Sequence, residues 1–199
     1  MRISIRVKVL LAGACMMAGP SVWGQQAQSS ASPTKGSLEI ALVYNPLMSN
    51  VVGGSGFWMQ GGSIQVHGQF WRGLGVVADV SGLHTANTSA SSGVGLDLVT
   101  ATFGPRYTWS PARGRYSVFG QVLAGEANGL HSVFPAASGA SDSADGLALY
   151  AGGGVNLHFK HRFALRAIEA DWLRTQLPNS TTNVQNNLRL GAGLIYTFK

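Results

Sequence analysis

Several charged residues of this sequence lie inside alternating apolar stretches, where ionised side chains can bind one another, an ion or a proton. Glu39 stands between Leu38 and Ile40. Successive side chains of an extended strand point to opposite faces, so the carboxylate faces away from its apolar neighbours. The same parity places six charged residues on one side, which are Glu39, Asp79, Arg106, Glu169, Asp171 and Arg189. Carboxylates and guanidinium groups that share an enclosed space can form an ion-pair network or line a path for protons.

Histidine and serine offer a second chemistry, that of a nucleophile activated by a base. His84-Thr85-Ala86-Asn87 and His131-Ser132 bring such residue types together. A nucleophile also needs a third group that orients the base, and neither stretch supplies a recognisable trio. Gly73-Leu74-Gly75-Val76-Val77-Ala78 matches a dinucleotide fingerprint by letter, but it opens an alternating stretch and not a helix. The single cysteine, Cys15, lies in the N-terminal segment. We therefore predict no catalytic, cofactor-binding or metal-binding residue.

The elements that must position these side chains are eight alternating stretches of 9 to 14 residues. A period of two indicates strands. Strands of this length match a tilted crossing of a bilayer, whereas strands of soluble proteins are commonly about five or six residues long. The predicted strands cover roughly 37–45, 57–70, 74–84, 96–109, 115–126, 147–159, 163–174 and 186–198.

The connections between these stretches alternate in length. The short ones are 71–73, 110–114 and 160–162, and the longest of the others runs from Ala127 to Gly146. This arrangement predicts an all-β fold, an eight-stranded antiparallel transmembrane β-barrel with short periplasmic turns and four longer external loops. A soluble ligand-binding barrel is the alternative, but it gives no reason for short and long connections to lie at opposite ends.

Aromatic residues gather near both ends of the predicted strands. Those near the short connections are Phe70, Trp71, Tyr107, Trp109, Tyr116, Phe159, Phe163, Tyr196 and Phe198, and those near the other end are Tyr44, Trp58 and Trp172. Two aromatic girdles are expected where rings lie at the level of lipid headgroups. Tyr196 and Phe198 therefore belong to the predicted periplasmic girdle.

The sequence over 37–199 resembles the family of small eight-stranded outer-membrane barrels that includes outer-membrane protein A and its adhesin-like relatives. The resemblance rests on the N-terminal leader, on Phe103-Gly104-Pro105-Arg106-Tyr107 and on the closing Tyr196-Thr197-Phe198. It implies that the barrel-assembly machinery reads a terminal aromatic, a role that Phe198 would fill. Lys199 follows Phe198 here, which departs from the family's usual aromatic C-terminus.

The N-terminal segment predicts export. Arg2, Arg6 and Lys8 precede an apolar run, and a cleavage site near Gly24 is expected, so we assign 1–24 to a signal peptide, 25–36 to a polar linker and 37–199 to the barrel. Cleavage removes three of 14 basic residues and none of eight acidic ones, which leaves 11 − 8 = +3. No basic stripe remains, so we expect no nucleic-acid partner.

Arg166 has the wrong parity for the interior unless a β-bulge near Ala167 reverses the alternation. We expect this bulge, because an arginine that faces lipid near the midplane costs about 2–4 kcal/mol. Arg166 then joins the other six charged residues. Eight strands enclose a space that side chains can fill, so we predict an interior plugged by ion pairs, with Glu39 as the acid that approaches Arg189.

The sequence therefore predicts an outer-membrane protein with a structural, surface-interaction or adhesion-like role. Outer-membrane lipids, lipopolysaccharide and the barrel-assembly machinery are the expected partners, and surface ligands would bind through the external loops. We expect a monomer without a cofactor or enzymatic activity. Two alternatives stay open, which are a narrow channel and a barrel enzyme that modifies lipid A.

Overall fold

The computed structural model describes residues 36–50, 56–88, 93–111, 115–137, 139–160, 162–179 and 182–198. The predicted signal peptide and the predicted linker lie outside the described residues, apart from Gly36. The strands are β1 (Leu38–Tyr44), β2 (Leu47–Ser49), β3 (Phe57–Trp71), β4 (Leu74–Thr85), β5 (Leu96–Trp109), β6 (Tyr116–Ala136), β7 (Gly139–Lys160), β8 (Phe163–Thr175) and β9 (Gln185–Phe198). Within these ranges there is no helix with the length and apolar character needed to cross a membrane.

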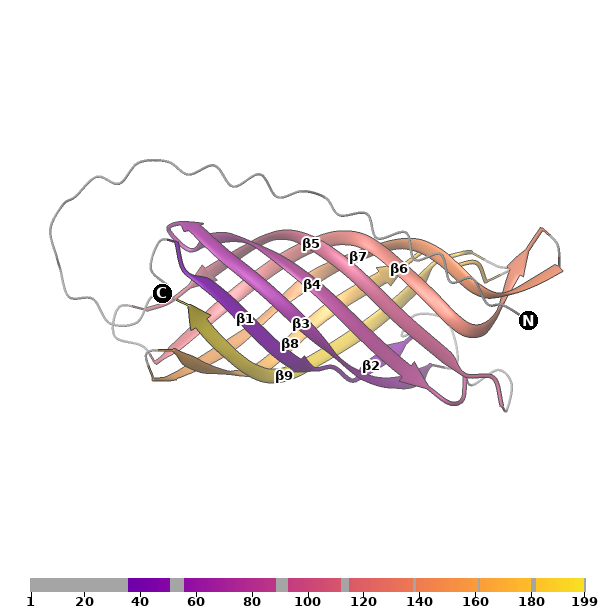
Figure 1. Ribbon diagram of the computed structural model, residues 1–199, viewed down its shortest axis with the longest axis horizontal. Coiled ribbons are helices and arrows are strands. Elements are labelled where there is room, and N and C mark those ends of the chain that lie inside the picture. The colour runs from indigo at the N-terminus through magenta and orange to yellow at the C-terminus, as the bar shows by residue number, and fades with distance from the viewer. Residues whose placement is uncertain are drawn as a thin grey trace, which may run out of the picture.

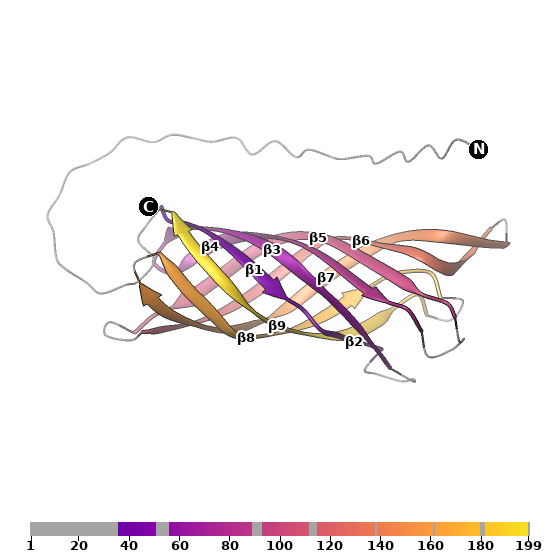
Figure 2. The ribbon, with the colours of Figure 1, turned by 60° about the horizontal axis from the view of Figure 1, so that its bottom comes forward.

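All nine strands belong to one closed antiparallel sheet. Both β1 and β2 pair with β3 on one side and with β9 on the other, so together they occupy a single position in the wall. The wall therefore has eight positions, and the predicted eight-stranded antiparallel barrel is confirmed. Figures 1 and 2 show an elongated barrel whose strands are strongly tilted against its long axis.

The first position of the wall is interrupted at Asn45 and Pro46. Proline has no backbone N–H, so it cannot donate a hydrogen bond to a neighbouring strand. The gap is closed by two other backbone bonds. The Asn45 N–H donates to the Gly61 carbonyl at 2.9 Å, and the Leu190 N–H donates to the Pro46 carbonyl at 2.9 Å. Pairing therefore continues on both sides of the interruption.

Side chains alternate between the outer surface and the lumen along each strand. On β4, Val76 and Val80 are about half exposed (47% and 55%), whereas Val77 and Asp79 have no exposed surface. The exposed large side chains are mainly aliphatic along the wall and aromatic near its ends. A barrel with apolar side chains outside and polar ones inside is the reverse of a water-soluble fold, and it suits a lipid environment.

The barrel has two different ends. The β3–β4 and β7–β8 turns and the end of β9 lie together, while the β6–β7 hairpin projects from the opposite end, here called the outer mouth (Figures 1 and 2). The predicted long loop from Ala127 to Gly146 is wrong, because β6 continues to Ala136 and β7 begins at Gly139. Backbone pairing extends this hairpin beyond the rest of the wall. The register shift between Leu130 and Phe134 interrupts the alternation within β6, so no single alternating pattern extends over this hairpin.

A bulge in β8 brings Arg166 into the lumen. Asn156 of β7 pairs with Arg166 and Val155 with Ile168, so Ala167 is an extra residue in β8. Ala167 and Ile168 are both exposed, whereas Arg166 and Glu169 on either side of them are both buried. The structure thus places the irregularity at the residue where the alternation of the sequence requires it.

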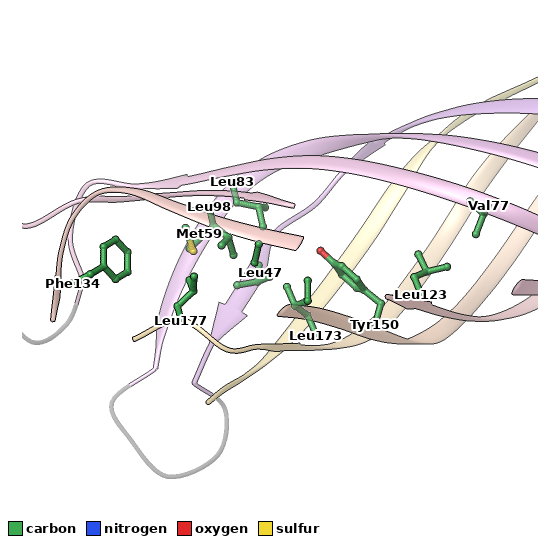
Figure 3. Packing of buried hydrophobic residues seen from close by; sticks show 12 residues of the cluster. Leu47, Met59, Val77, Leu83, Leu98, Leu123, Phe134, Tyr150, Leu173 and Leu177 are labelled. Atoms are coloured by element: carbon green, nitrogen blue, oxygen red, sulfur yellow. The ribbon is translucent and has the colours of Figure 1, made fainter. Parts of the chain in front are cut away.

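The lumen contains an apolar region in addition to its polar side chains. The buried hydrophobic cluster comprises Leu47, Met59, Val77, Leu83, Leu98, Leu123, Ala127, Phe134, Ala148, Tyr150, Leu173 and Leu177. Figure 3 shows these side chains in a column, with Phe134 at the outer mouth and Tyr150 deeper in the barrel. The sequence analysis predicted only the charged part of this interior.

Candidate functional site

The centre of the polar interior is Arg189, which contacts three carboxylates. Its Nη2 lies 2.8 Å from Asp171 Oδ2 and 3.3 Å from Glu169 Oε1, and its Nη1 lies 3.2 Å from Asp79 Oδ2. These side chains come from β4, β8 and β9, and none is more than 1% exposed. The Arg189 guanidinium carbon also lies 4.3 Å from the centroid of the Tyr150 ring, a cation–π distance.

Two further arginines share one aromatic ring. The guanidinium carbons of Arg106 and Arg166 lie 4.4 Å and 4.6 Å from the centroid of Phe119. Arg166 also pairs with Glu169 at 2.8 Å and donates to Asn156 Oδ1 at 3.2 Å. Like charges placed this close repel, so their bonds to carboxylate and amide oxygens are needed to hold them.

Gln65 and Gln121 connect the arginines to the acids. The Gln65 side-chain oxygen accepts hydrogen bonds from Arg106 and Arg166, and its amide nitrogen donates to Asp79 at 2.8 Å. Gln121 repeats the arrangement. Its oxygen accepts from Arg106 at 2.5 Å, and its nitrogen donates to a carboxylate oxygen of Glu169 at 2.9 Å. Each amide presents its oxygen to cations and its nitrogen to anions.

The sequence analysis missed both glutamines because it followed charge alone. Gln65 stands between Ile64 and Val66, and Gln121 precedes Val122, so strand parity already turns both amides away from outward-facing residues. The same alternating pattern could therefore have predicted that these uncharged polar side chains point into the lumen. They matter here because Arg106 makes its hydrogen bonds to these two amides, which connect it to the acids of the interior.

Glu39 does not approach Arg189, so that predicted pair is wrong. Glu39 pairs in register with Thr197 of β9, whereas Arg189 pairs with Leu47 of β2. Eight positions along a strand correspond to about 26 Å, which no side chain bridges. Glu39 instead lies 3.0 Å from the Nδ1 atom of buried His67. These two residues form a separate pair inside the barrel.

The polar network, defined as Gln65, Asp79, Arg106, Gln121, Asn156, Arg166, Glu169, Asp171 and Arg189, draws a side chain from every strand from β3 to β9. It holds three arginines and three acids, so its formal charges balance. Side chains from seven strands that bond to one another fill the cross-section of a narrow barrel. The arrangement is that of a plug.

A second polar cluster lies on the outer surface near the mouth. The two carboxylate oxygens of Asp97 accept hydrogen bonds from His84 Nδ1 at 2.5 Å and from His131 Nδ1 at 2.6 Å. Both imidazoles are largely exposed. These hydrogen bonds hold the pKa of the Asp97 carboxyl below its usual value. Through Asp97 the cluster connects β4, β5 and the base of the β6–β7 hairpin. Among the described residues no group of three or more His, Cys, Asp or Glu side chains is arranged to hold a metal ion.

Aromatic side chains surround the end of β9. The ring centroids of Tyr196 and Phe198 are 4.8 Å apart, and those of Tyr196 and Phe163 are 5.2 Å apart, both with edge-to-face geometry. Arg162 donates a hydrogen bond to the Tyr196 hydroxyl at 3.3 Å. These residues form a compact aromatic group at the short-turn end, and Lys199 lies outside the described residues.

No protein-family model matches the sequence, and no curated protein matches it either. Three solved structures are similar to the barrel. Neisserial surface protein A is 11% identical with a TM-score of 0.61, over 82% of this chain and 100% of that chain. The attachment invasion locus protein of Yersinia pestis, in complex with the heparin analogue sucrose octasulfate, is 20% identical with a TM-score of 0.53, over 83% and 100%. Outer membrane protein OprG from Pseudomonas aeruginosa is 9% identical with a TM-score of 0.51, over 82% and 96%.

These similarities agree with the ring of strands, the apolar outer surface and the polar lumen. At such low sequence identity these similarities show a shared fold and nothing more. The chain therefore has the fold of the small eight-stranded outer-membrane β-barrels.

Proposed function

We propose that this chain is an outer-membrane protein whose barrel is a closed anchor for an external interaction surface. The observation that carries the proposal is the polar network across the lumen of a barrel with an apolar outer wall. An apolar wall is stable in the hydrocarbon core of a membrane, and a filled lumen leaves no wide path through it. Interactions with other molecules then fall to the parts outside the membrane.

The projecting β6–β7 hairpin is the main external element that the structure describes. It carries Asp142 and Asp145, and its base is held to the barrel by the His131–Asp97 hydrogen bond. A surface-interaction or adhesion-like role suits this hairpin because it projects beyond the rest of the wall, where other molecules can reach it. The attachment invasion locus protein, which has a similar fold and was crystallised with a heparin analogue, supports the idea that such barrels can carry surface ligands.

The rest of the proposal follows from an outer-membrane position. The signal peptide would be cleaved near Gly24, and the barrel-assembly machinery would then insert the chain. The inserted protein would be a monomer, surrounded by outer-membrane lipids and lipopolysaccharide. The bases Arg72, Arg115 and Arg162 at the short-turn end would face anionic headgroups of the inner leaflet. We propose no enzymatic activity, because the interior chemistry is engaged in ion pairs and hydrogen bonds.

Labelling of intact cells tests the location and the orientation together. Asp142→Cys on the hairpin should react with a membrane-impermeant maleimide, while Arg72→Cys in the β3–β4 turn should react only after lysis. Both variants should fractionate with the outer membrane and migrate faster on gels unboiled than boiled. Recovery in the soluble periplasm would contradict the location, and labelling of Arg72→Cys on intact cells would contradict the orientation.

Two further measurements test the closed, non-enzymatic anchor. The purified barrel in planar bilayers should give no stepwise conductance, since the network fills the lumen. Lipid A isolated from expressing cells should keep the mass of the control strain. Regular conductance steps would favour the channel, and a discrete mass change of lipid A would favour the enzyme.

A further inference from the structure

A cavity of about 500 Å³ lies at the outer mouth, between the strand ends and the β6–β7 hairpin. Phe57, Leu96 and Leu177 line it from the barrel side, Val133 and Phe134 line it from the hairpin, and six uncharged polar residues, among them Ser49 and Gln185, complete its rim. Beneath it, Phe134 and Leu177 belong to the buried apolar column (Figure 3). The volume is within the range of small-molecule sites, which are concave and mostly apolar.

None of the side chains that line this cavity is charged. Its polar groups are partly engaged within the protein. Gln185 accepts a hydrogen bond from the Leu177 N–H at 3.0 Å and donates to the Leu177 carbonyl at 2.9 Å, and Ser49 donates to Asn187 at 2.8 Å. A charged guest would lose hydration without gaining a partner of opposite charge. The lining therefore selects against ionised molecules.

An irregularity in β6 builds one wall of the cavity. Strict alternation from the outward-facing Leu130 would turn His131 inward and Phe134 outward. The structure has the opposite arrangement, because the register shifts between Leu130 and Phe134 and His131 adopts a left-handed backbone with φ of 55°. This conformation is unfavourable for a residue with a side chain, and such strain tends to occur at functional sites.

The shift has two results. The His131 imidazole reaches Asp97 on the outer surface, 2.6 Å away, and the Phe134 ring turns over Gly129. A Cβ atom at Gly129 would lie 2.5 Å from the tip of the Phe134 ring, so only glycine leaves room for the ring there. A strained backbone, a hydrogen bond on one face and a glycine on the other thus hold the aromatic floor of the cavity in place.

We propose that this cavity binds a small, neutral and predominantly apolar molecule that enters from the external water. The path inward ends part-way along the apolar column, where Tyr150 packs against Arg189 of the polar network (Figure 3). The molecule is therefore held at the mouth. This inference goes beyond the anchoring role and does not depend on the nature of the surface partner.

The test uses the full chain in lipid nanodiscs, with 13C-labelled leucine and valine methyl groups, and 1-naphthol as a neutral aromatic probe. Leu96 and Leu177 report on the cavity. Leu42 and Leu194, which are 59% and 64% exposed on the outer wall, report on partitioning of the probe into lipid. We expect saturable shifts of the Leu96 and Leu177 methyl signals, and only a linear drift of the Leu42 and Leu194 signals. If the Leu96 and Leu177 methyl signals show no saturable shift, the proposal is overturned.

A matched pair of leucine variants locates the site. Leu96→Trp enlarges a side chain that lines the cavity and should weaken 1-naphthol binding at least tenfold. Leu42→Trp makes the same change on the outer wall, where Leu42 is 59% exposed, and should leave the affinity unchanged. Equal affinities of the two variants would refute binding at this cavity.

A charged analogue tests the chemistry of the site in the unaltered protein, independently of whether a variant folds. The 1-naphthoate anion should bind at least tenfold more weakly than 1-naphthol. Equal or tighter binding of the anion would refute a site for neutral molecules.

Discussion

Replacing Arg189 with leucine removes the one side chain that contacts all three acids of the polar network. Its guanidinium donates hydrogen bonds to Asp79, Asp171 and Glu169 over distances of 2.8–3.3 Å. In the variant the two remaining arginines face three acids, so one buried negative charge has no compensation. Breaking a buried pair in this way typically destabilises a protein by about 3–5 kcal/mol.

Urea unfolding in lipid vesicles, followed by tryptophan fluorescence, measures this loss. With a denaturant slope of about 2 kcal/mol per molar, a loss of about 3–5 kcal/mol lowers the midpoint by about 1.5–2.5 M. Arg115→Leu is the control, because Arg115 is an exposed residue just before β6. Its free energy of unfolding should change by no more than about 0.5 kcal/mol.

Double variants identify which acids are coupled to Arg189. Adding Asp171→Leu to Arg189→Leu should recover at least about 1 kcal/mol, since the charges are removed together. Adding Glu39→Leu should give an additive loss, because Glu39 pairs with His67. The reasoning is refuted if Arg189→Leu is as stable as Arg115→Leu, or if Glu39→Leu is the change that restores stability.

Three further changes test other parts of the molecule. Phe198→Ala should lower the amount of folded protein in the membrane, measured by heat-modifiable migration, whereas Phe103→Ala on the middle of the wall should not; equal yields would show that the terminal aromatic carries no assembly signal. Deleting Ala167 should prevent a stable barrel, because it turns Arg166 toward lipid at a cost of about 2–4 kcal/mol, and a deletion variant with a normal urea midpoint would contradict the role of the bulge. The Asp97 carboxyl has a lowered pKa in the folded state, so its stabilisation of the hairpin is present above the unfolded pKa near 3.8 and is lost as the pH falls through the folded value. Asp97→Asn should therefore make the hairpin more sensitive to protease at pH 7, and the difference from the parent should disappear at strongly acidic pH.

Alternation in the sequence was sufficient to predict the wall of the barrel. Its period decides which side chains face lipid, and even the bulge at Ala167 follows from the burial that Arg166 requires. The β6–β7 hairpin could not be predicted in this way. Near its tip both faces of the hairpin are exposed, so the residues there need no apolar face, and closer to the wall the register shift between Leu130 and Phe134 interrupts the period.

The partners inside the lumen could be predicted only in part. The alternation shows whether a side chain points into the lumen, but it does not show its position along the barrel axis. That position depends on the stagger between neighbouring strands. Glu39 and Arg189 both point inward from adjacent positions in the wall, yet the register separates them by eight residues. The apolar column was missed for a related reason, because inward leucines such as Leu83 and Leu98 follow the same alternation as polar residues and do not stand out by charge.

The polar network also constrains the order of events during membrane insertion. Gln65 bonds to Glu169, 104 positions later, and Asp79 bonds to Arg189, 110 positions later. None of these contacts can exist before the last strands reach the first ones, and ionised groups without partners are costly in hydrocarbon. A partly built sheet would hold bare guanidinium groups against acyl chains, so the inner surface has to stay in water until β9 meets β1. Dehydration of the lumen and joining of the two terminal strands therefore have to be a single step, and an open-sided intermediate has no stable place within the bilayer.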